Sequence, residues 1–133
     1  MENFPYTDLQ LAWLHDLETT EIGQAERYLF KDNKYCCLGR ACLIAGFEFD
    51  KKRVTNTPFV KGHPAHYSTL PTPVWQKLQL RDKRGGFDGE PVISDDYSPL
   101  CTLAELNDAG WTFKRIAAFV RARPQDVFTN LEL

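Results

Sequence analysis

Four cysteines are the residues of this chain best suited to chemistry, and three of them lie close together, at Cys36, Cys37 and Cys42. Zinc sites use ligand pairs such as Cys-x2-Cys, and the cysteines show no such spacing, so the sequence predicts no metal site. A thiol nucleophile is better motivated at Cys37, which lies near an expected strand-to-helix boundary where backbone amides and the helix dipole favour a thiolate. His63 or His66 would then act as the base of a hydrolase or transferase, in a papain-like order of Cys before His.

Burial in the core is the interpretation that we favour for these thiols. Free cysteine is among the most buried residue types, and Cys36 and Cys37 stand between apolar neighbours. Adjacent strand residues point to opposite faces, so we expect no disulfide between the two. The acidic start Met1-Glu2-Asn3 is unlike a signal peptide, and no apolar run approaches the roughly 20 residues of a membrane helix. We therefore expect a cytoplasmic protein with reduced cysteines and no membrane association.

Charged residues are segregated along the chain, although the net charge is only −2. Residues 1–26 and residues 85–108 each hold six acidic residues and no Lys or Arg, whereas residues 27–84 hold twelve basic and four acidic residues. Such blocks either neutralise one another when the chain folds, which is the simpler interpretation, or form a polarised recognition surface. In the second case the turn with Asp95 and Asp96 would bind a basic partner. An acidic small ligand such as a nucleotide would bind instead to the basic cluster Lys51, Lys52 and Arg53.

Asn107 and Asp108 stand at the end of an expected helix, shortly before Gly110. An acidic side chain at this end opposes the helix dipole, which breaks a local rule without an evident gain. The pair therefore either caps the following loop or binds a ligand, and both interpretations stay open.

The pattern of residues 112–131 resembles a helix-turn-helix, which would make the protein a DNA-binding regulator. The second helix of this motif offers Asp126 and Glu132 but no Lys or Arg. Since cations supply most of the affinity for a phosphate backbone, we do not expect nucleic acid to be the partner.

Local signals predict the elements that would position these residues. Thr7 and Gln10 form a capping box for a helix over residues 8–19, and Thr102 and Thr112 begin helices that reach about residues 109 and 121. Further expectations are a hairpin with strands 27–30 and 34–37, a buried helix from Gly39 to Gly46, a loop over 55–69, a helix with Thr72 as its N-cap, short strands at 47–50 and 91–93, and a last short helix over 125–131. The predicted fold is one α-rich α+β domain, residues 1–133, with four or five short helices around a small β-hairpin or sheet.

Four segments together resemble a family of small uncharacterised proteins of bacteriophages and prophages. They are a helix with Trp13, the block Gly23-Gln24…Tyr35-Cys36-Cys37-Leu38-Gly39…Cys42, the stretch Leu70-Pro71…Val74-Trp75…Leu78, and the block Leu103-x-x-Leu106-Asn107-Asp108-x-Gly110-x-Thr112-Phe113-x-x-Ile116-Ala117. The resemblance implies a phage-encoded accessory protein of the bacterial cytoplasm, with no established activity. We expect a non-enzymatic, cofactor-free protein that inhibits a bacterial host or defence component by binding a protein or by sequestering an acidic small ligand. A cysteine enzyme and a DNA-binding regulator are the alternatives.

Overall fold

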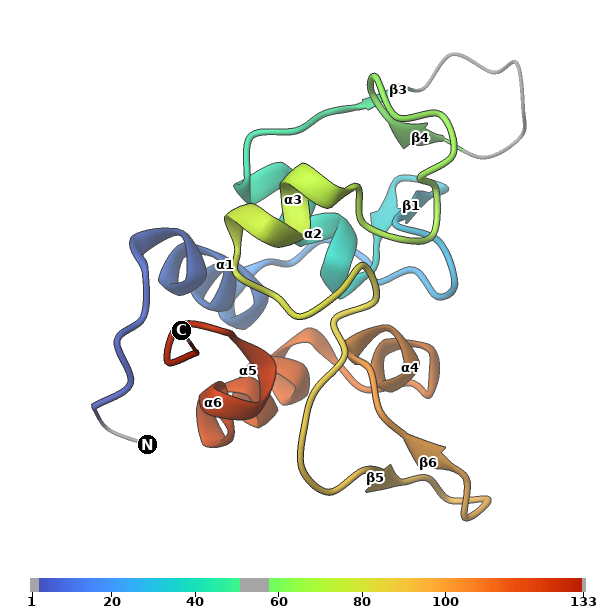
Figure 1. Cartoon of the computed structure of the whole chain (residues 1–133). Helices are drawn as coiled ribbons and strands as arrows, with labels where there is room; N and C mark the ends of the chain where they lie inside the picture. Colours follow the sequence, from blue (N-terminus) through green and yellow to red (C-terminus); the bar gives the residue numbers. More distant parts are fainter. Residues whose placement is uncertain (1–2, 51–57, 133) are drawn as a thin grey trace.

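The computed structural model describes residues 3–50 and 58–132, which form six helices and three separate two-stranded antiparallel sheets (Figure 1). The helices are α1 (Asp8–Thr19), α2 (Cys37–Ile44), α3 (Thr72–Lys77), α4 (Leu103–Asp108), α5 (Phe113–Ala122) and α6 (Pro124–Val127). The strand pairs are β1 (Phe30–Lys31) with β2 (Lys34–Tyr35), β3 (Phe49–Asp50) with β4 (Phe59–Val60), and β5 (Val92–Ile93) with β6 (Pro99–Leu100). The expected α-rich α+β class is confirmed, with six helices where four or five were expected.

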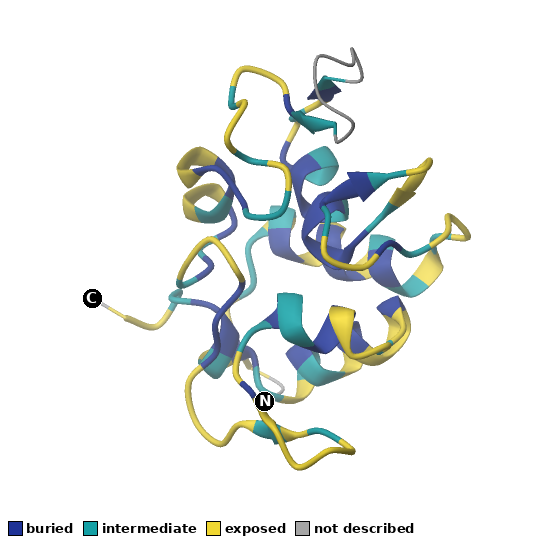
Figure 2. Cartoon of the chain, turned by 90° about the vertical axis from the view of Figure 1, so that its right-hand side faces the viewer, coloured by how far each residue is buried: buried dark blue, intermediate teal, exposed yellow. Residues whose placement is uncertain are grey.

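The core lies where α1 packs against α2 and α5, and where α4 packs against the same two helices. Figure 2 shows the buried residues gathered on the helix faces that turn toward the middle of the molecule. On α5 these are Phe113, Ile116, Ala117 and Val120, whose spacing of three or four residues places them on one face of the helix. None of the described helices has both the length and the apolar character needed to span a membrane.

The capping box that predicts α1 is present. Thr7 Oγ1 accepts a hydrogen bond from the amide of Gln10 at 3.1 Å, and Gln10 Oε1 accepts one from the amide of Thr7 at 3.0 Å. The Gln10 side chain is fully buried, and its Nε2 also donates to Leu78 O and to Asn130 Oδ1. One capping residue therefore ties α1 to the segment after α3 and to the C-terminal segment.

Helix α2 begins earlier than predicted, at Cys37 rather than after Gly39. Cys36 is the N-cap, and its Sγ accepts a hydrogen bond from the amide of Gly39 at 3.3 Å. Gly39 serves close packing, because a Cβ at this position would lie 1.8 Å from the carbonyl oxygen of Leu29. The helix ends where Gly46 adopts a left-handed φ of 90°, as its position predicts.

Other boundaries also differ from the sequence-based expectations. The turn of the predicted hairpin is present, with positive φ values of 54° at Asp32 and 61° at Asn33. Its strands are shorter than predicted, and β1 covers 30–31 instead of 27–30. The N-cap of α3 is Pro71 rather than Thr72, and no side chain caps this helix. Within the predicted loop over 55–69 lies β4, and β6, the partner of β5, was not predicted.

Candidate binding groove

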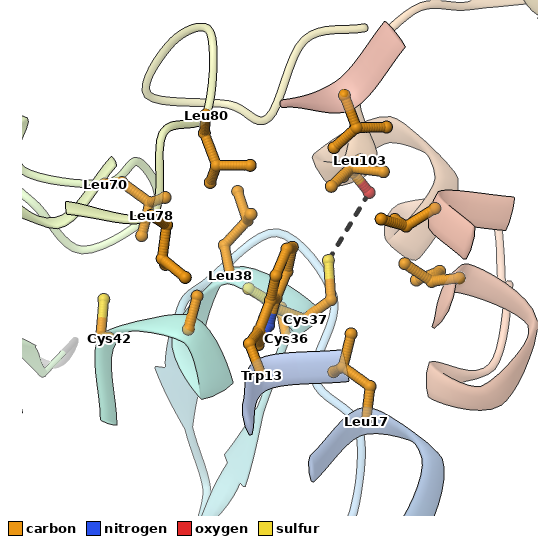
Figure 3. Close-up of a cluster of buried hydrophobic side chains, with 14 of the residues drawn as sticks. Trp13, Leu17, Cys36, Cys37, Leu38, Cys42, Leu70, Leu78, Leu80 and Leu103 are labelled. Atoms are coloured by element: carbon orange, nitrogen blue, oxygen red, sulfur yellow. Dashed lines mark hydrogen bonds between the residues drawn. The ribbon is translucent and has the colours of Figure 1, made fainter. Parts of the chain in front are cut away.

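The thiols of the Cys-Cys pair lie in the core, close to the N-terminus of α2 (Figure 3). Cys37 is the first residue of α2, although the sequence predicted it at the end of a strand, and its side chain is fully buried. Its Sγ lies 3.8 Å from the carbonyl oxygen of Leu103, and its own carbonyl accepts a hydrogen bond from Trp13 Nε1. Burial raises the pKa of Cys37 well above its ordinary value and raises the pKa of Cys36 to about 12. Desolvation therefore outweighs the helix N-terminus, and both groups are thiols at neutral pH.

The two candidate bases are engaged elsewhere. His63 and His66 follow β4, and their ring centroids lie 6.2 Å apart. His66 Nδ1 lies within hydrogen-bond distance of the carbonyl and hydroxyl oxygens of Thr69, and the His63 ring faces Phe47. A nucleophile and its base need hydrogen-bond contact, and no hydrogen bond within residues 3–50 and 58–132 joins either histidine to Cys37. This geometry does not favour a cysteine enzyme.

Asn107 joins three parts of the core. It is 1% exposed, its Oδ1 accepts hydrogen bonds from Gln24 Nε2 at 2.8 Å and from the amide of Cys37 at 3.0 Å, and its Nδ2 donates to the carbonyl of Ala25 at 2.7 Å. The Asn side chain thus caps the first amide of α2 from the end of α4. Its neighbour Asp108 is exposed, and its Oδ1 accepts a hydrogen bond from the amide of Arg27.

The helix-turn-helix alternative finds little support in the geometry of the C-terminal helices. Helix α6 has only four residues, of which Pro124 and Val127 are buried. The cations nearby are also occupied, because Arg121 pairs with Glu18 and Arg123 pairs with Asp126. The basic cluster Lys51, Lys52 and Arg53 lies outside the described residues.

An open groove of about 600 Å³ lies between the β5–β6 hairpin and the α4–α5 segment, and we call it the hairpin groove. In Figure 1 this hairpin extends away from the helices, below α4. Its apolar lining includes Val92, Ile93, Leu100 and Trp111. Its charged lining consists of one cation, Arg115, and four carboxylates, Asp95, Asp96, Glu105 and Asp108. Three acidic residues singled out from the sequence thus meet in one place, and a fourth joins them.

Three of these carboxylates are each held in place through one oxygen. Asp96 Oδ1 accepts hydrogen bonds from Ser94 Oγ and from the amide of Ser98, and these bonds lower the pKa of Asp96. Glu105 Oε1 accepts from the amide of Cys101 and from the hydroxyl of the N-cap Thr102, and Asp108 is held by Arg27 as described above. Within the described residues the second oxygens of Glu105 and Asp108 take no hydrogen bond, and the Asp95 side chain takes none at all.

The two acidic blocks of the sequence differ in how many of their carboxylates form ion pairs. In the first block, Asp16 forms a two-bond pair with Arg40 and Glu18 forms another with Arg121. In the second block, Asp88 pairs with Arg81, but none of the four groove carboxylates forms an ion pair with any part of the described chain. Ion pairs therefore neutralise part of the first block, whereas the groove gathers four carboxylates that form no ion pair within the described residues.

Sequence reasoning missed Glu105, Trp111 and Arg115 as groove residues. Glu105 is one of the acidic residues of the block 85–108, and in the structure it also helps to cap α4. The available signal was only their nearness in the sequence, with Trp111 just before the N-cap Thr112 and Arg115 in the first turn of the helix. The Arg115 guanidinium carbon lies 3.7 Å from the centroid of the Trp111 ring.

Compared with models of protein families, with curated proteins and with solved structures, the chain gives no match. Among the described residues, no group of three or more His, Cys, Asp or Glu side chains is arranged to hold a metal ion.

Proposed function

We propose that this protein acts by binding, and that its hairpin groove receives a positively charged segment of a protein partner. The observation that carries the proposal is the set of four carboxylates in one groove, none of which is ion-paired within the described residues. Negative charge gathered in a concave site attracts cations and speeds their association. The apolar lining, which includes Ile93 and Trp111, supplies surface that a peptide segment can bury.

Preorganisation supports the same proposal. Asp96, Glu105 and Asp108 are each fixed by a turn, a helix cap or a contact to a neighbouring segment, so little side-chain freedom is lost when a partner binds. The free second oxygens of Glu105 and Asp108 point to a role as acceptors for donors of another molecule. In a phage-encoded accessory protein of the bacterial cytoplasm, such a groove would serve to inhibit a host or defence protein by occupying its basic surface.

A charge reversal at Asp95 tests the proposal, because this side chain has no hydrogen bond to lose within the described residues. Wild-type protein and Asp95→Lys are used to capture partners from bacterial lysate, and the captured protein is then purified for kinetic measurements. We expect the variant to melt at the wild-type temperature and its association rate constant to fall about tenfold at low ionic strength, with a smaller effect at high salt.

Glu90→Lys is the matched control. Glu90 is exposed and belongs to the same acidic block, but it does not line the groove. The control should bind as the wild type does. Equal capture by the wild type, the control and a folded Asp95→Lys would show that the groove is not the interface.

A further inference from the structure

Arg115 already places a cation in the hairpin groove. Its guanidinium carbon lies 3.7 Å from the centroid of the Trp111 ring, which is the distance of a face-on cation–π contact. Arg115 is exposed and forms no ion pair with the groove carboxylates or with any other described residue. The ring contact is the one interaction of this side chain that the described structure contains, so the guanidinium can be displaced at little cost.

The combination of an indole face with carboxylates suits a guanidinium better than an ammonium group. A guanidinium is planar, stacks on aromatic rings and donates two parallel hydrogen bonds to one carboxylate, whereas an ammonium group is a compact and strongly hydrated charge. The rings of Trp111 and Phe119 form a T-shaped contact at 84°, which restricts the orientation of the indole. The acceptors in the same groove are the carboxylate oxygens of Asp95, Asp96, Glu105 and Asp108.

We propose that the hairpin groove selects arginine over lysine in its partner, and that Arg115 holds the Trp111 face in the free protein until the partner's arginine replaces it. The inference rests on the proposed function and adds to it the identity of the recognised side chain. Arg115 is then an internal competitor, and its removal strengthens binding instead of weakening it.

The test uses two synthetic peptides, acetyl-Gly-Arg-Ile-Arg-Gly-amide and its counterpart with lysine in place of both arginines. Each is titrated into the full-length protein, with calorimetry for the affinity and the indole N–H resonance of Trp111 as the local reporter. The wild type should bind the arginine peptide more tightly than the lysine peptide. Arg115→Ala should tighten arginine-peptide binding by about two- to fivefold, the range expected for one exposed cation–π contact.

Lys114→Ala is the control for net charge. Lys114 is exposed, adjacent to Arg115 and outside the groove lining, so its removal changes the charge equally without freeing the indole. It should tighten binding less than Arg115→Ala does. In a folded Trp111→Leu variant, verified by circular dichroism, the preference for arginine should disappear while binding that depends on Asp95 remains.

The outcomes separate this inference from the proposed function. Equal affinity for the two peptides, or equal effects of Arg115→Ala and Lys114→Ala, would overturn arginine selection and displacement. If Asp95→Lys still weakened both peptides in that case, the groove would remain a general site for cations. Binding that is absent in the wild type, or unchanged in Asp95→Lys, would overturn both proposals.

Discussion

Replacement of Asn107 by alanine tests whether this residue is a structural joint or a ligand contact. The side chain links the end of α4 to the first amide of α2 and to the carbonyl of Ala25, and the residue is only 1% exposed to solvent. Alanine removes both hydrogen-bonding atoms of the Asn107 side chain, Oδ1 and Nδ2. The amide of Cys37 and the carbonyl of Ala25 would then stay buried without partners.

The size of the effect follows from these two orphaned groups. A buried backbone group without a partner costs about 1–3 kcal/mol, so Asn107→Ala should lower the free energy of unfolding by about 2–6 kcal/mol. Gln24 adds little to this sum, because its Nε2 keeps a second acceptor, the carbonyl of Trp111 at 2.6 Å. Domains of this size have a total stability of about 5–15 kcal/mol, so the variant loses a large share of it.

Urea unfolding followed by circular dichroism measures the loss, and Asn130→Ala is the matched control. Asn130 also makes three side-chain hydrogen bonds, to Gln10 and to the carbonyl of Pro5, but it is only half-buried. Water can replace its bonds, so the control should lose less than half as much stability. A loss below about 1 kcal/mol in Asn107→Ala, with an unchanged dependence on urea, would refute the role of Asn107 as a buried joint.

Three further predictions concern Gly39 and the cysteines. Gly39→Ala should unfold the protein or lower its stability by more than about 3 kcal/mol in thermal melts, because the added methyl group would collide with the backbone of Leu29, and a stability within about 1 kcal/mol of the wild type would contradict this. Native alkylation at pH 7 should modify the exposed Cys101 and spare the three buried thiols until unfolding, and rapid native modification of Cys37 would revive the enzyme alternative. Because burial raises the pKa of Cys36 from 9.0 to about 12, the folded state keeps a proton that the unfolded state releases above pH 9. The contribution of this thiol to stability should therefore be constant below about pH 9 and fall as the pH rises toward 12, which urea unfolding at a series of alkaline pH values would measure.

Elements with strong local signals could be predicted from the sequence. The capping box of Thr7 and Gln10 and the N-cap Thr112 are satisfied by residues three positions away, so their chemistry is complete within one turn of helix. The start of α2 was misplaced because Cys36 caps it through sulfur, a weak acceptor that capping rules do not include. Strand β6 was missed because two residues, one of them Pro99, carry no periodicity.

The groove could be anticipated only in part. Asp95 and Asp96 were found through the composition of their turn, and Asp108 through its unfavourable position at a helix end. Nothing local shows that these segments approach one another, because the hairpin and α4 meet through tertiary packing. The sequence also could not show which acidic residues form ion pairs in the fold, because Glu18 pairs with Arg121 at a separation of 103 residues.

Asn107 and Asp108, at the C-terminal end of α4, serve the core and the groove respectively. Asn107 turns inward and holds α2, whereas its neighbour Asp108 turns outward, binds the amide of Arg27 and keeps a free oxygen in the groove. Arg27 has a left-handed φ of 72°, an unfavourable conformation for a residue with a side chain, and the Asp108 carboxylate stabilises the turn that contains it. The acidic residue that opposes the dipole of α4 is thus compensated by this contact. Because Asn107 fixes the helix end from inside, the carboxylate of Asp108 is presented to the groove on a rigid support, which is the arrangement that a preorganised binding site requires.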